Sequence, residues 1–193
     1  MTADFPVVLD ACVLANQSVT DLLLRLAETP RLYLPYWSEQ ILEETTRTLI
    51  EKLGWPQELA RYREEQMRDH FPEAIIRFPK SLLSVLTNDE KDRHVLAAAI
   101  RAKVEVIVTF NLRHFGPEHL KPWEISASSP DQFLMSLMGL QPMLVFTRIT
   151  EIGQARKIAI REVLISLRRS VPRFAEIVAG GMSMQLGPPS PLA

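Results

Sequence analysis

Residues 7–10 read VVLD, a short apolar and β-branched run that ends on an acid. Such a run is typical of a buried parallel strand, and residues 22–27 then carry apolar side chains at helical spacing. This stretch predicts a strand followed by a helix, the first unit of a parallel α/β sheet. A structural role at the tip of a buried strand would usually be filled as well by Ser, Thr or Asn. Asp10 is therefore the strongest single candidate for a functional residue.

The same alternation continues along the chain. It predicts further strands over residues 31–35 and 104–109 and near Ile125, and further helices that begin at Ser38, at Pro56, at Asn88 or Asp89, and at Pro130. The proline-punctuated residues 72–79 are expected to leave the sheet. Strands that alternate with helices indicate a three-layer α/β/α fold with a central parallel sheet, in which ligands bind outside the carboxyl ends of the strands.

The chain is expected to divide into a domain over residues 1–140, a basic helical extension over residues 141–185 and a disordered proline-rich tail over residues 186–193. The net charge is −1, yet from Gln141 onward seven Lys and Arg stand against three acids, which gives +4 and leaves −5 for the first 140 residues. One or two amphipathic helices are expected in the extension, with Pro172 between them. By default the extension is interpreted as a solvated helix packed on the domain. A phosphate-contacting arm and a dock for a protein partner stay open.

Cysteine content and hydropathy limit the environment of the protein. A single cysteine, Cys12, excludes an internal disulfide and a cysteine-rich zinc site, which agrees with a reducing compartment. No run approaches the roughly 20 uninterrupted apolar residues of a membrane span, and the N-terminus lacks the pattern of a signal peptide. We therefore expect a cytoplasmic protein without a membrane partner.

Acidic and amide side chains lie at strand ends, near helix starts and, for Glu44, about two turns into a predicted helix, where the sheet is expected to gather them. They are Asp10, Glu44, Asp89, Asp92 and Asn111. Carboxylates that crowd a partly buried cleft repel one another unless a cation compensates their charge. Oxygen ligands without sulfur or a histidine cluster favour Mg²⁺ or Mn²⁺, and these ions support phosphodiester hydrolysis by activating a water and aligning the phosphate.

Each of these acids also has an ordinary explanation when it is taken alone. Asp10 and Asp89 are suitable helix N-caps, and Glu44 and Asp92 are compatible with solvated helix faces. Glu43 precedes Glu44, and because successive helical residues point about 100° apart, only one of the two can face a shared pocket. Periodicity and spacing alone do not choose between these interpretations.

Five segments between Val7 and Leu140 resemble, in order, the motifs of the PIN domain family, and especially its VapC-like branch. They are VVLDACVLA, SEQILEETTRTL, NDEKDRHVLAAAI, VTFNLRHF and SPDQFL. No single segment is specific, but five in the right order at ordinary spacing form a strong signal. In this resemblance the principal acids of the family fall on Asp10, Glu44 and Asp92, and an accessory acid falls on Asp89.

The resemblance implies a pocket that holds Mg²⁺ or Mn²⁺ on Asp10, Asp92 and Glu44, and metal-dependent endoribonuclease activity on single-stranded or looped RNA. It further implies the toxin component of a type II toxin-antitoxin system, with a cognate antitoxin protein as partner, and a homodimer.

The fourth motif departs from the family at one position. An aspartate is common there, and this chain has Asn111, whose amide ligates weakly and adds no negative charge. Arg113 and His114 follow it and are candidates for contact with the substrate. For His114 a purely structural role within the loop is an equal alternative.

Two rival functions, a phosphatase and a silent binding module, make different demands on the sequence. A phosphatase whose first strand also ends in aspartate needs a second acid two residues later, and Cys12 occupies that position, which argues against this chemistry. A catalytically silent PIN-like module that binds RNA or protein would be marked by loss of the pocket acids, and at least three of them are present.

Overall fold

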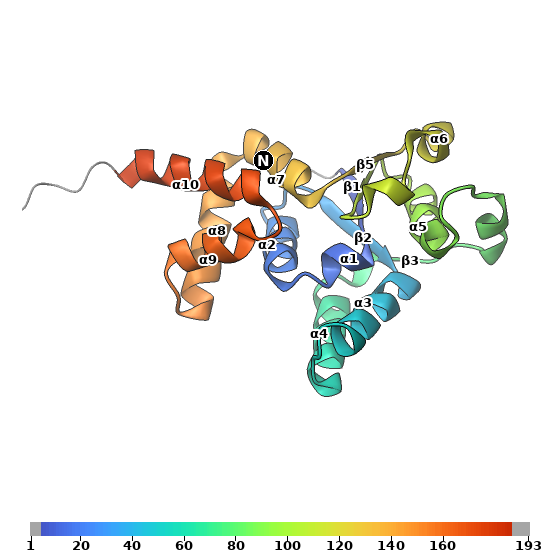
Figure 1. Cartoon of the computed structure of the whole chain (residues 1–193), viewed down its shortest axis with the longest axis horizontal. Coiled ribbons are helices and arrows are strands. Elements are labelled where there is room, and N and C mark those ends of the chain that lie inside the picture. Colours follow the sequence, from blue (N-terminus) through green and yellow to red (C-terminus); the bar gives the residue numbers. More distant parts are fainter. Residues whose placement is uncertain (1–4, 187–193) are drawn as a thin grey trace, which may run out of the picture.

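The computed structural model describes the backbone of residues 5–186 and the side chains of residues 5–181. Five parallel strands form one sheet in the order β3-β2-β1-β4-β5. The strands are β1 Pro6–Leu9, β2 Leu34–Ser38, β3 Ile75–Ile76, β4 Val106–Val108 and β5 Ser126–Ser128. Because all of them run in one direction, their carboxyl ends meet at the same edge of the sheet (Figure 1).

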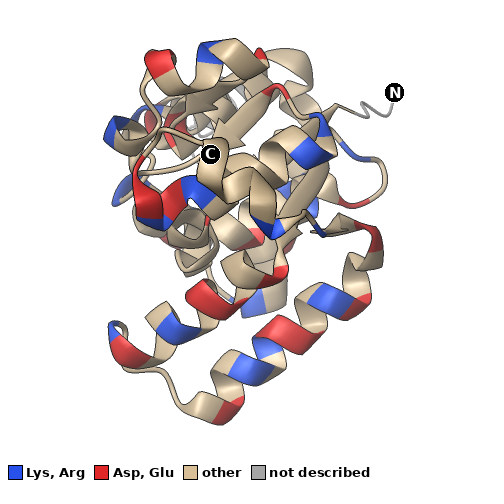
Figure 2. Ribbon diagram, turned by 90° about the vertical axis from the view of Figure 1, so that its right-hand side faces the viewer, with Lys and Arg blue, Asp and Glu red and all other residues tan. Residues whose placement is uncertain are grey.

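Helices cover the sheet, which confirms the predicted three-layer α/β/α fold (Figure 1). Those before residue 141 are α1 Ala11–Leu14, α2 Gln17–Ala27, α3 Glu39–Glu51, α4 Gln57–His70, α5 Arg93–Ala102, α6 Pro117–Leu120 and α7 Pro130–Leu140. Short 3₁₀ turns join them: η1 Pro72–Ala74, η2 Lys80–Val85, η3 Glu90–Asp92, η4 Leu112–His114 and η5 Lys121–Trp123. Helices α3 and α4 pack on each other as a projecting hairpin along which charges of both signs alternate (Figure 2).

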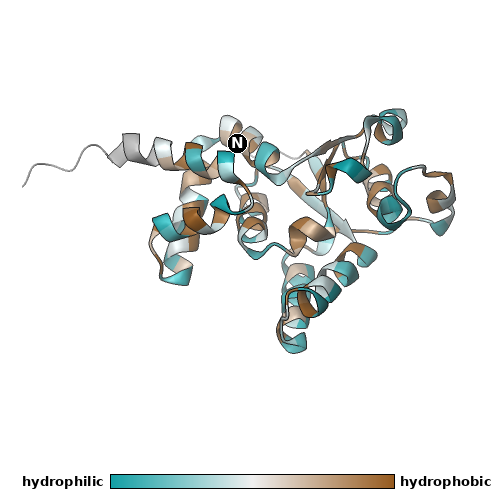
Figure 3. Cartoon of the chain, in the orientation of Figure 1, coloured by the Kyte–Doolittle hydropathy of each residue, from teal (hydrophilic) through white to brown (hydrophobic). Residues whose placement is uncertain are grey.

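The core explains why the first strand lies at the centre of the sheet. Strand β1 pairs with β2 on one side and with β4 on the other, and its residues Val7, Val8 and Leu9 are fully buried. The short helix α1, which follows directly, is hydrophobic along its length and mostly buried (Figure 3). Burial on both faces is what a continuous apolar run predicts for a parallel strand.

The predicted helix starts are largely confirmed. Ser38 caps α3 by accepting a hydrogen bond from the backbone N–H of Ile41 at 3.2 Å. Pro56 precedes α4, and Pro130 is the first residue of α7. Asp89 caps the 3₁₀ turn η3 rather than α5 itself, which begins at Arg93.

The second strand lies three residues later than predicted. It begins at Leu34, whose backbone N–H donates to the carbonyl of Phe5 at 2.9 Å, and it continues to Ser38. Residues 31–33 do not join the sheet, because the N–H of Leu32 still bonds to the carbonyl of Leu26 and closes the turn after α2.

The expectation that residues 72–79 leave the sheet is wrong. Ile75 and Ile76 form β3 and pair with Trp37 and Ser38 at the edge of the sheet. The prolines at positions 72 and 79 flank this strand without interrupting it, and an edge position is one that nearby proline tolerates.

The C-terminal extension contains three helices where one or two were expected: α8 Pro142–Arg156, α9 Ile160–Arg168 and α10 Pro172–Leu186. Lys157, with a φ of 54°, ends α8, and Pro172 begins α10 as predicted. Helix α8 packs against α2, and the disordered tail expected over residues 186–193 lies outside the described residues apart from Leu186.

Two arginines of the extension, Arg148 and Arg156, bind groups within the molecule. Arg148, which is 8% exposed, donates to the backbone carbonyls of Glu28 and Thr29 at 3.3 and 3.1 Å and pairs with Glu151 at 2.9 Å. Arg156 reaches Asp21 on α2 at 2.7 Å. These contacts favour the interpretation of the extension as a packed part of the fold.

Between residues 5 and 186, no single helix is long and apolar enough to cross a membrane. Helices α7 and α8 satisfy the criteria of length and composition only as a pair, which is bent by 119°.

Candidate active site

Asp10 lies directly after β1 at the carboxyl edge of the sheet and is 3% exposed. Its Oδ2 accepts hydrogen bonds from the Thr109 hydroxyl at 2.6 Å and from the Cys12 thiol at 3.1 Å. The side chain does not cap α1, so the ordinary explanation of this acid as an N-cap does not hold.

Burial dominates the electrostatics of Asp10. It raises the pKa of this carboxyl above the ordinary value of 3.8, and the charge of Asp92 raises this pKa further. The hydrogen bonds from Thr109 and Cys12 act in the opposite direction without cancelling the effect of burial. The same environment, again chiefly through burial, raises the pKa of the Cys12 thiol to about 12, so this cysteine stays a neutral hydrogen-bond donor.

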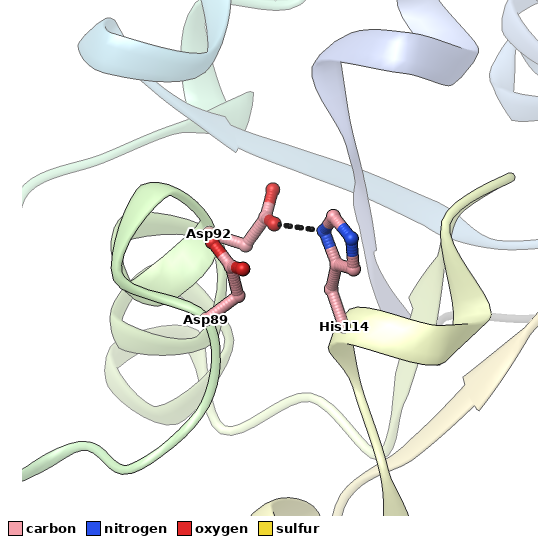
Figure 4. Close-up of side chains that lie close together, drawn as sticks. All are labelled: Asp89, Asp92 and His114. Carbon is pink, nitrogen blue, oxygen red and sulfur yellow. Dashed lines mark hydrogen bonds and ion pairs between the residues drawn. The ribbon is translucent and has the colours of Figure 1, made fainter.

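Asp89, Asp92 and His114 form a cluster at the same edge (Figure 4). One ligand atom from each lies within 4.8 Å of the others. Asp92 is 8% exposed, and its Oδ2 lies 2.6 Å from His114 Nδ1. Asp89 is exposed, and one of its oxygens also accepts from the backbone N–H of Lys91 at 3.1 Å. Spacing by three residues across η3 thus places both aspartates together.

Glu44 faces a different neighbour. Its Oε2 lies 3.2 Å from Nε2 of His94 on α5, and this contact is the main cause that lowers the pKa of the Glu44 carboxyl below its ordinary value of 4.5. Glu43 is exposed on the side toward α4, so the two neighbouring glutamates face different parts of the molecule. Within residues 5–181, Glu44 and Asp10 fall outside the compact cluster around Asp92.

The fourth motif contacts the site through the backbone of Asn111 and the side chain of Thr109. The backbone N–H of Asn111 donates to the Thr109 hydroxyl at 2.9 Å, while its half-buried side chain does not cap η4. Arg113 is exposed, and its Nε donates to His114 Nε2 at 3.0 Å. His114 therefore lies between the guanidinium of Arg113 and the carboxylate of Asp92.

The donor set fits a hard divalent cation. Asp10 and Asp92 are both buried carboxylates, and the charge of Asp92 raises the pKa of Asp10, so a cation would relieve an unfavourable charge in this part of the site. Asp89 and His114 offer further ligand atoms beside Asp92. Carboxylate oxygens suit Mg²⁺ and Mn²⁺, while an imidazole nitrogen in the set widens the choice of ion.

Three polar residues of the site were missed from the sequence. Thr109 and Cys12 bind Asp10 directly, and His94 binds Glu44. A signal for Thr109 was available, because it follows β4 just as Asp10 follows the neighbouring β1. His94 was hidden because it lies among apolar residues of a predicted core helix, and the structure buries it to 2% exposure.

The fold and the site together define a parallel α/β protein with buried acids at the carboxyl edge of its sheet. A sequence model of the PIN domain matches residues 4–113, more than half of the chain, and the chain therefore belongs to the PIN domain family. This confirms the resemblance seen in the motifs.

One relative extends this finding to the VapC-like branch. A protein of Mycobacterium tuberculosis named "Putative ribonuclease VapC50" is 52% identical to the chain over 59 residues, which cover 31% of this chain and 35% of that protein. The match thus spans about a third of the relative's length. No solved structure matches the chain.

Proposed function

We propose that this protein is a metal-dependent endoribonuclease and the toxin component of a type II toxin-antitoxin system. The observation that carries the proposal is the buried carboxylate of Asp10, which Thr109 and Cys12 hold at the carboxyl edge of the sheet and whose pKa the charge of Asp92 raises. Membership of the PIN domain family and the likeness to a protein named as a ribonuclease support it.

Asp10, Asp92 and Glu44 would hold Mg²⁺ or Mn²⁺, with Asp89 and Asn111 as accessory groups. When bound, the ion would supply activation of a water and stabilisation of charge on the leaving oxygen. Burial of Asp10 and its two hydrogen bonds keep the carboxylate fixed, so that little reorganisation is needed when substrate binds.

Arg113 and His114 would contact the phosphate of the substrate. Arg113 is exposed and presents the remaining nitrogens of its guanidinium beside His114, a geometry suited to phosphate oxygens. The contact between His114 and Asp92 links this phosphate-binding pair to the acids. A cytoplasmic location, a cognate antitoxin that blocks the acids and a homodimer are further parts of the proposal.

The activity is tested with the purified full-length chain and end-labelled single-stranded RNA and DNA of the same sequence, each incubated with Mg²⁺, Mn²⁺ or EDTA. The proposal expects internal cleavage of the RNA with either ion and none with EDTA. RNA that is bound but never cleaved would identify a silent binding module instead. Growth arrest of cells that express the chain would support the toxin role if co-expression of a small protein encoded by the neighbouring reading frame relieved it.

A further inference from the structure

A cavity outside the acidic cluster is lined in part by His94, the residue that contacts Glu44. It has a volume of about 340 Å³ and lies between α3, η2 and the start of α5, where Gln40, Lys80, Ser84, Glu90, Arg93 and His94 line it. Ligand pockets commonly start at about 300 Å³, so a single nucleotide unit fits the dimensions.

His94 connects this cavity to the proposed active site. The imidazole is 2% exposed, and its Nε2 faces Glu44 at 3.2 Å. Its Nδ1 is also buried and has no hydrogen-bond partner among the residues that the structure describes. A buried polar atom without a partner costs free energy, and a ligand that supplied a hydrogen bond in the cavity would remove this cost.

The charge of the cavity is opposite to that of the acids beyond His94. Lys80 and Arg93 carry two positive charges against the single acid Glu90. Arg93 is held in place because its Nε donates to the carbonyl of Asn88 at 3.3 Å. Positive side chains beside an acidic centre are suited to bind the phosphate that lies next to the scissile phosphate in the same nucleic-acid chain.

We propose that this cavity binds one ribonucleotide of single-stranded RNA next to the scissile bond, with its phosphate on Lys80 and Arg93 and its 2′-hydroxyl on His94 Nδ1. A 2′-hydroxyl both donates and accepts hydrogen bonds, so it satisfies this nitrogen in either tautomer, and it is the group that distinguishes RNA from DNA. The inference rests on the proposed ribonuclease function, because it assigns part of that substrate.

The phosphate contact is tested by fluorescence anisotropy with a labelled single-stranded RNA and the full chain carrying Asp10→Asn, which separates binding from cleavage. Adding Lys80→Gln should raise the Kd about threefold to tenfold and make the slope of log K against log salt shallower by about 0.7. Lys121→Gln is the matched control, because it removes the same charge from an exposed residue that does not line the cavity. Equal effects of the two substitutions, or no binding of RNA by Asp10→Asn, would overturn the subsite.

The hydroxyl contact is tested by the ratio of affinities for RNA and for DNA of the same sequence. In the Asp10→Asn background, His94→Phe keeps the bulk of the ring and should bring the ratio of RNA affinity to DNA affinity closer to one. General loss of structure would instead weaken the binding of RNA and of DNA together. An unchanged ratio would overturn the contact. The two proposals fail separately. Weaker RNA binding by Lys80→Gln, together with no RNA cleavage by the wild type, would overturn the ribonuclease function and leave a nucleotide-binding cavity. RNA cleavage by the wild type, together with RNA binding that neither substitution changes, would overturn only the subsite.

Discussion

Thr109 Oγ1 lies 2.6 Å from Asp10 Oδ2 and joins the carboxyl ends of two neighbouring strands. The same hydroxyl accepts the backbone N–H of Asn111 at 2.9 Å, so its own hydrogen is directed at the carboxylate. The fourth motif thus supports the site through Thr109 and the backbone, while the amide of Asn111 adds no charge beside an acid that is already difficult to ionise. Thr109 is accordingly a positioning residue.

Replacing this hydroxyl by a methyl group should weaken both the fold and the site. Thr109→Val leaves the Asn111 N–H without its partner and leaves Asp10 Oδ2 with the Cys12 thiol as its side-chain donor. This loss is expected to cost about 1–3 kcal/mol in the free energy of unfolding. It should also raise the pKa of Asp10 further, because Thr109 lowers it in the wild type. Urea unfolding measures the cost, and Thr109→Ser, which keeps the hydroxyl, should remain close to the wild type. Equal stability of Thr109→Val and wild type would refute the role.

Asp10 should make the metal-free protein less stable as the pH rises. Its pKa is raised in the folded state, so its contribution to stability is fully present below the ordinary value of 3.8 and is lost as the pH rises through the folded pKa. In EDTA, Asp10→Asn should therefore raise the Tm at neutral pH, by about 2–4 °C for each kcal/mol regained, and should lose this advantage in acid. Thermal unfolding across pH is the measurement. A lower Tm for Asp10→Asn at neutral pH would mean that the charged carboxylate stabilises the fold.

Glu44 should show the opposite dependence. Its pKa is lowered, mainly by the hydrogen bond with His94, so its contribution is present above the ordinary value of 4.5 and is lost as the pH falls through the folded pKa. The stability difference between wild type and Glu44→Gln should shrink in acid. Glu43→Gln is the matched control, because it removes the same charge from the neighbouring side chain, which is exposed on the side toward α4. Parallel curves for the two variants would contradict the pairing of Glu44 with His94.

Arg148 should couple the C-terminal extension to the PIN domain. Arg148→Ala leaves the carbonyls of Glu28 and Thr29 without their donor and is expected to cost about 1–3 kcal/mol in the free energy of unfolding. Arg161→Ala removes an exposed arginine of α9 and should stay within about 0.5 kcal/mol of the wild type. Chemical denaturation compares the two, and similar small losses would show that the extension is held by apolar packing alone.

Much of this architecture could be predicted from local sequence signals. Continuous burial of Val7, Val8 and Leu9 and the N-cap at Ser38 follow from short patterns that tertiary contacts do not override. The edge strand at Ile75 and Ile76 could not be predicted in this way, because two residues carry no periodicity and only pairing with β2 defines them.

The candidate site, like the fold, could be predicted only in part from the sequence. Asp10, Asp89 and Asp92 are conspicuous because they lie at a predicted strand end or helix start, whereas Glu44 lies inside a helix and was singled out by the resemblance to the second motif. The partners of these acids are not conspicuous in the sequence. Thr109 is 99 residues away from Asp10 along the chain, and His94 and Glu44 lie on two different helices. Contacts of this kind are set by how the sheet and helices pack, so only the structure reveals them.

Cleavage of total cellular RNA by wild type, Asp10→Asn and Asp92→Asn, purified identically, tests the central claim most directly. With Mg²⁺ or Mn²⁺ the wild type should give discrete products, and both variants should be slower by more than about 100-fold, while thermal unfolding shows that they remain folded. Products that appear equally with the variants, or that persist in EDTA, would contradict the account, because the activity would then not belong to this acidic site.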